Sequence, residues 1–186
     1  MKVLIDLTSL ADNFSGIERF ALSITKELIS DQSRSDIEYI LVFKNRYIKI
    51  FLRSRTMLEK IIVRGKNKLI FNQLQLPLKL TTIKADYYFF PAFPAPFFFF
   101  NRNAISAIHD VGCWDCPSKN KRYMTLYFKL MYRKAALGHK KVVTVSQFSK
   151  DRISKILKKN PEEIAVIYDG FIGLLCELFT MIEDKI

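Results

Sequence analysis

Two residues capable of chemistry stand together at the end of a short apolar segment. Residues 104–108 are small or apolar, and His109 and Asp110 follow them directly. This pattern predicts a buried strand that carries an imidazole and a carboxylate to the carboxyl edge of a sheet, where open α/β sheets bind their ligands. The alternative is that the pair only caps a loop.

A glycine-containing turn is the second candidate for ligand binding. Residues 2–7 predict a strand and residues 12–16 a turn, and Ser15 with Glu18 three positions later forms a capping box that opens a helix. The free amides of a helix start, placed at the edge of a sheet, can bind phosphate. Gly16 would then give a ligand access to these amides, although it could also serve only to ease the helix start.

Strands and helices alternate along the chain. The predicted strands cover residues 2–7, 37–43, 61–63, 87–90, 104–108, 142–145 and 164–168. Predicted helices follow the Gly16 turn and cover residues 47–57, 69–80, 121–137 and 147–159. This alternation predicts an α/β fold with a parallel sheet and helices on both faces. Ser146 caps the last of these helices, and we expect it, with Ser15 and Gly16, to bind substrate.

Two apolar features are expected to pack into the core. In helix 121–137 a stripe of large side chains has helical spacing: Tyr123, Leu126, Tyr127, Leu130 and Met131. Residues 91–100 hold three prolines, which predict a loop. We expect the phenylalanines of this loop to pack beneath it. The alternative is an exposed apolar patch beside basic residues such as Arg102, suited to a lipid-linked partner.

The chain is strongly basic, with 30 Lys and Arg against 18 Asp and Glu and a formal charge of +12. This excess favours phosphorylated ligands, acidic lipid headgroups or nucleic acid as partners. No nucleic-acid-binding motif accompanies it, so we expect no nucleic-acid partner. The sequence contains neither a signal peptide nor an apolar segment long enough to span a bilayer. We expect a cytoplasmic protein, with peripheral contact at the inner face of an anionic membrane as one option.

Cys113 and Cys116 have the two-residue spacing of zinc or redox pairs. Zinc would need two further ligands, and only His109, His139 and Cys176 are available. A thioredoxin-like pair would open a helix after a strand near the amino end. We therefore interpret the two cysteines as ordinary loop residues and expect no metal.

Five motifs in order, residues 4–6, 15–20, 108–110, 143–149 and 164–170, resemble the amino-terminal half of retaining glycosyltransferases of family four. The resemblance covers residues 1–171 and implies one Rossmann-like domain of the two-domain GT-B architecture. It implies transfer of a sugar from a nucleotide-sugar, which is the donor substrate, to a saccharide or lipid-linked acceptor, as in surface polysaccharide synthesis. No metal or other cofactor is required.

The resemblance assigns roles to individual residues. It places Gly16 near the donor diphosphate, where turn amides can stabilise the charge of the leaving group. It places His109 near the transferred sugar and the acceptor, with Asp110 able to orient the imidazole. Two positions depart from the family pattern: Glu18 replaces a small residue, and Asp169 replaces a frequent asparagine.

Residues 172–186 resemble neither the interdomain linker nor the second domain, which would bind the nucleotide. We therefore expect the acceptor-side half of an enzyme, inactive alone, whose donor-binding half is encoded separately. The alternative is a non-catalytic truncated remnant or an accessory binding domain. A basic nucleic-acid-binding or zinc-binding module is a weaker third hypothesis.

Overall fold

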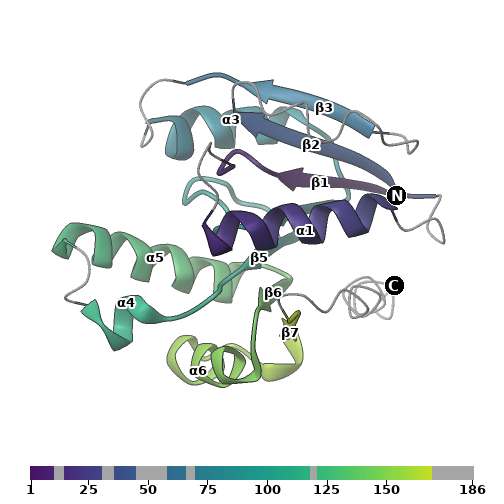
Figure 1. The fold of residues 1–186 in the computed structure, drawn as a ribbon. Helices are drawn as coiled ribbons and strands as arrows, with labels where there is room; N and C mark the ends of the chain where they lie inside the picture. Colours follow the sequence, from purple (N-terminus) through teal and green to yellow (C-terminus); the bar gives the residue numbers. More distant parts are fainter. Residues whose placement is uncertain (11–14, 31–35, 45–57, 66–69, 118–120, 169–186) are drawn as a thin grey trace.

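The structure, a computed structural model, describes residues 1–10, 15–30, 36–44, 58–65, 70–117 and 121–168. Its centre is a seven-stranded, wholly parallel sheet in the order β3-β2-β1-β4-β5-β6-β7 (Figure 1). The strands are β1 (Lys2–Asp6), β2 (Glu38–Lys44), β3 (Leu58–Val63), β4 (Tyr87–Phe90), β5 (Ala104–Ala107), β6 (Lys141–Thr144) and β7 (Ile164–Val166). The strand order reverses between β1 and β4, which is where Rossmann-like sheets bind their ligands.

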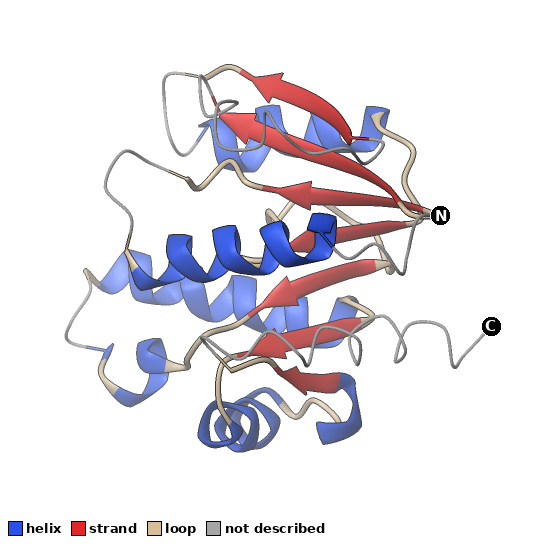
Figure 2. Ribbon diagram, turned by 45° about the vertical axis from the view of Figure 1, so that its right-hand side comes forward, coloured by secondary structure: helices blue, strands red, loops and turns tan. Residues whose placement is uncertain are grey.

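Helices cover both faces of this sheet. The helices are α1 (Gly16–Ser30), a π-helical turn (Phe71–Gln75) that leads into α3 (Leu76–Thr82), α4 (Gly112–Asp115), α5 (Arg122–Gly138) and α6 (Gln147–Leu157), followed by a 3-10 turn (Pro161–Glu163). Figure 2 shows α1 in front of the strands, with α3 and α5 behind them. The predicted Rossmann-like α/β fold is thus confirmed.

The side chains of the strands explain this layering. In β1, Val3 and Ile5 point toward α1 and pack in the same cluster as Phe20, whereas Leu4 points the other way and packs with Leu80 of α3. All three β1 residues are at most 1% exposed. A strand buried on both faces is apolar throughout, which is why these segments could be recognised as strands from the sequence.

The helix predicted over residues 69–80 is continuous, but it changes from π-helical to α-helical just before its proline. The π-helical turn ends at Gln75, and α3 starts at Leu76 with Pro77 in its first turn. Proline has no amide hydrogen to donate, and Pro77 lies where the hydrogen-bonding pattern of the helix changes from π to α. The predicted helix 47–57, the turn 12–16 except for Ser15 and Gly16, and the tail 172–186 lie outside the described residues.

The prediction for the apolar stripe of α5 was largely wrong. Tyr123, Leu126 and Leu130 are exposed, and of the five stripe residues only Met131 is buried. The buried face of α5 consists of Thr125, Met131, Ala135 and Ala136. Small side chains let the helix lie close to the sheet, so the bulky residues point away from it.

Both expectations for residues 91–100 hold in part. Phe99 is 1% exposed, and its ring packs against those of Tyr88 and Phe90 with centroids 5.1 and 5.6 Å apart. Phe98 and Phe100 are 53% and 75% exposed. Within the described part of the chain, no helix is both long and apolar enough to cross a bilayer.

Candidate functional site

His109 lies just beyond β5, at the carboxyl edge of the sheet and next to the point where the strand order reverses. Its imidazole Nε2 is 3.1 Å from the carbonyl oxygen of Pro91, which follows β4. A carbonyl can only accept, so Nε2 carries the proton and donates it to this bond. The ring is half-buried and meets the edge of the Phe20 ring at 90°, with centroids 5.0 Å apart.

The contact with Phe20 brings His109 close to the start of α1. Phe20 lies four residues after Gly16, one helical turn into α1. Figure 1 shows α1 beginning at the edge where the strands end. Gly16 is exposed, and among the described residues no atom lies within 4 Å of where its Cβ would be. The imidazole and the helix start therefore share one rim of the sheet, with open space beside the glycine.

The predicted pairing of Ser15 and Glu18 is confirmed. The Ser15 backbone amide donates to Glu18 Oε2 at 2.8 Å, and the Ser15 hydroxyl donates to the same oxygen. The Glu18 carboxylate thus binds the free amide that precedes the helix, where an anionic ligand would otherwise find a donor. A negative charge at this position weakens the attraction of the α1 start for phosphate.

Asp110 is exposed and accepts a hydrogen bond from the Gly112 amide at 2.7 Å. This bond caps the short helix α4, which is the loop-capping role that the sequence left open. The hydrogen bond that holds Nε2 of His109 is the one to the carbonyl oxygen of Pro91.

Asp6 is a candidate that the sequence analysis did not place among the site residues. It ends β1 beside the reversal point, and its Oδ1 accepts from the Thr8 amide at 3.0 Å. Burial raises the pKa of its carboxyl from 3.8 to about 6, against the lowering effect of the Thr8 bond. A carboxyl that titrates near neutral pH at a ligand-binding edge can exchange a proton with a ligand. The available signal was a single acidic residue ending an apolar strand.

Ser146 lies at the same carboxyl edge of the sheet, just after β6, the strand that pairs with β5. Its Oγ accepts from the Ser149 amide at 3.1 Å and donates to the Ser149 hydroxyl at 3.0 Å. The predicted helix cap is therefore confirmed, and its role in substrate binding stays a prediction.

The two closely spaced cysteines are free thiols in different environments. Cys113 is buried, which raises the pKa of its thiol to about 11, while Cys116 is exposed. A raised pKa suppresses the thiolate that redox chemistry needs. Among the described residues, no three His, Cys, Asp or Glu side chains gather closely enough to hold a metal ion.

The fold is similar to that of HepE from Anabaena. The chain matches the crystal structure of HepE in complex with UDP-glucose with a TM-score of 0.58 at 17% identity, and that with UDP and glucose with a TM-score of 0.53 at 16% identity. Each match covers 92% of this chain but only 44% and 45% of HepE, so the chain spans less than half of HepE's length. No known protein family and no curated protein matches the sequence. At this identity the likeness shows the Rossmann-like fold alone.

Proposed function

We propose that this chain is the acceptor-side domain of a glycosyltransferase that moves a sugar from a nucleotide-sugar to a saccharide or lipid-linked acceptor. The observation that carries the proposal is the shared rim formed by His109 and the start of α1, at the edge where Rossmann-like sheets bind ligands. It is supported by the likeness of the fold to HepE, which has been crystallised with UDP-glucose. Retention of configuration and membership of family four are proposed on the motif resemblance alone.

In this proposal each residue has a stated task. The amides at the start of α1 face the diphosphate of the donor and stabilise the charge of the departing nucleoside diphosphate. His109 hydrogen-bonds a sugar hydroxyl, with its ring held by Pro91 and Phe20. Asp6, whose pKa lies near 6, is placed to accept a proton at the same edge. The remainder of the donor site is supplied by a second, donor-binding domain.

The experiment is to measure nucleoside diphosphate release with a panel of nucleotide-sugars and membrane-derived acceptors. The chain is assayed alone and together with a donor-binding domain supplied as a second chain. We expect transfer only from the pair.

A non-catalytic domain is the second candidate function, and Glu18 favours it. Its carboxylate binds the Ser15 amide and opposes an anionic ligand at the start of α1. This candidate predicts no turnover with any donor, even when the second chain is present. Turnover by the pair would dismiss it.

A further inference from the structure

Most of the large apolar side chains that are exposed on the described residues belong to three segments on the α5 side of the sheet. We call their outer face the α3–α5 surface. It comprises Ile70, Leu74, Leu78, Phe98, Phe100, Tyr123, Leu126, Leu130 and Leu137. A surface helix normally turns polar residues to solvent, so this concentration requires an explanation.

The outward stripe of α5 forms the largest part of this surface. Leu126, Leu130 and Leu137 are 60%, 46% and 75% exposed. At the helical repeat of roughly 100° per residue, these three leucines lie within about 40° of one another around the helix axis. The outward face of α5 is thus mostly apolar, with the exposed Arg133 lying within the leucine stripe.

Hydrogen bonds join the three segments into one continuous surface. The Gln73 side chain accepts from the Phe97 amide at 3.0 Å, and its amide group bonds to the Tyr127 hydroxyl. Lys134 of α5 donates to the carbonyl oxygens of Pro96 and Phe99 at 2.9 and 2.6 Å, and also to that of Phe97. The three segments are therefore linked directly by side-chain hydrogen bonds.

Lys134 also explains why Phe98 and Phe100 stay exposed to solvent. Its ammonium group lies 4.4 Å from the centroid of the Phe100 ring, and its burial lowers the pKa to about 8. Three carbonyl partners and the ring fix the backbone around residues 96–100 while Phe99 is packed inward. Phe98 and Phe100 are then held in an outward position.

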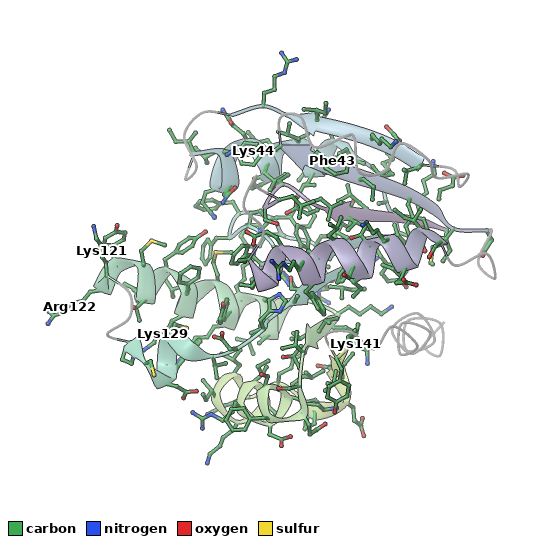
Figure 3. The ribbon with its side chains drawn as sticks, viewed as in Figure 1. Phe43, Lys44, Lys121, Arg122, Lys129 and Lys141 are labelled. Carbon is green, nitrogen blue, oxygen red and sulfur yellow. The ribbon has the colours of Figure 1, made fainter. Side chains whose placement is uncertain are left out.

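The charged side chains of the three segments are all basic. Residues 70–82, 91–103 and 121–138 contain no Asp or Glu and seven basic residues: Lys79, Arg102, Lys121, Arg122, Lys129, Arg133 and Lys134. Figure 3 shows Arg122 extending from the amino-terminal end of α5, away from the sheet, with Lys121 next to it. Exposed leucine and phenylalanine surrounded by lysine and arginine is the composition of surfaces that bind anionic membranes.

We propose that the α3–α5 surface docks the protein on an anionic lipid bilayer. The leucines and phenylalanines enter the headgroup region, while the basic residues contact acidic headgroups. A second copy of the chain is a poor occupant, because a symmetric contact would bring two wholly basic faces together.

This docking also has a consequence for the proposed function. The segment that ends with Phe100 begins at Pro91, whose carbonyl binds His109. The surface and the candidate site are therefore joined by one short piece of chain. On the basis of the proposed function, docking would present the site to an acceptor anchored in the same bilayer.

The experiment is cosedimentation with lipid vesicles, which requires no sugar transfer. Vesicles of phosphatidylcholine alone are compared with vesicles that also contain phosphatidylglycerol, at low and high salt. The test variant is Leu126→Ser with Leu130→Ser. The matched control is Phe148→Ser, which removes an apolar side chain 73% exposed on α6 and outside the surface. Circular dichroism verifies that each variant is folded.

We expect binding to the anionic vesicles only, weakened by salt, and reduced about tenfold or more in the leucine variant but unchanged in the control. Replacing Lys121 and Arg122 by Gln should weaken binding, whereas replacing the exposed Lys26 and Lys155 by Gln should do so less. Equal binding by the leucine variant and Phe148→Ser would overturn the proposal. So would concentration-dependent self-association that the leucine changes abolish without any vesicle binding. Sugar transfer to a soluble acceptor should be unchanged in the leucine variant. A failure of membrane docking can then be distinguished from a failure of the proposed sugar transfer.

Discussion

Replacing Asp6 by Asn should stabilise the protein at neutral pH. The carboxyl group ends β1 in a partly buried position, where desolvation raises its pKa from 3.8 to about 6. Folding therefore favours the protonated carboxyl, and its ionisation lowers the free energy of unfolding. Asparagine removes the charge, and its carbonyl can keep the bond that Oδ1 accepts from the Thr8 amide.

The size of the effect follows from the two pKa values of Asp6. Each tenfold change in an acid constant corresponds to about 1.4 kcal/mol, so a rise from 3.8 to about 6 gives an upper limit of about 3 kcal/mol. The residue retains some exposure, and we expect about 1–2 kcal/mol. Below about pH 3 the carboxyl is protonated in both states and the cost vanishes; the cost grows as pH rises from about 4 to about 6 and is constant above that.

The assay is urea unfolding of the wild type and Asp6→Asn at about pH 3 and about pH 7.5. Asp86→Asn is the matched control, because that carboxylate also accepts a backbone amide, from Lys2 at 2.7 Å, but is exposed. The free energy of unfolding should rise for Asp6→Asn at the higher pH alone. An equal gain at both pH values, or none relative to Asp86→Asn, would refute the desolvation of Asp6.

Three further results are expected. Glu18→Gln should raise the affinity for UDP about two- to fivefold in titration calorimetry, because it removes a negative charge from the start of α1; Glu27→Gln, near the other end of α1, should not. Ser106→Ala should lower the free energy of unfolding by about 1–3 kcal/mol, since Ser106 Oγ bonds His139 Nδ1 at 2.9 Å and the Ala95 amide at 3.1 Å in the core, whereas Ser30→Ala on the surface should change it little. Iodoacetamide should label Cys116 in the native protein and leave Cys113 unmodified, and rapid labelling of Cys113 would contradict its burial.

The inner strands of the sheet were predictable because they are buried on both faces, unlike the edge strand β3. Segments such as Val3 to Ile5 and Val142 to Val143 are apolar without interruption, and each ends close to where the sequence placed its end. The position of His109 beyond β5 followed from the same reasoning. Its contacts with Pro91 and Phe20 did not, because they join residues that are far apart in the sequence.

The orientation of α5 was not predictable from hydrophobic spacing. This helix contains no acidic residue. One of its faces carries bulky side chains and another carries small ones, and apolar periodicity alone predicts that the bulky face is buried. The structure buries Ala135 and Ala136 instead, because the depth of the space against the sheet decides which side chains fit. The raised pKa of Asp6 is likewise a consequence of tertiary burial. A sequence gives the residue but not the amount of solvent that folding removes from it.

The most direct test of the central claim is the rate of sugar transfer by His109→Ala in the reconstituted pair of chains. Lys155→Ala, an exposed position in the last turn of α6, serves as the control for a substitution that touches neither the rim nor the α3–α5 surface. If His109 binds the reacting sugars at the rim it shares with α1, its loss should slow transfer about tenfold or more at unchanged stability. Transfer by His109→Ala at the rate of the control would contradict the assignment of the site.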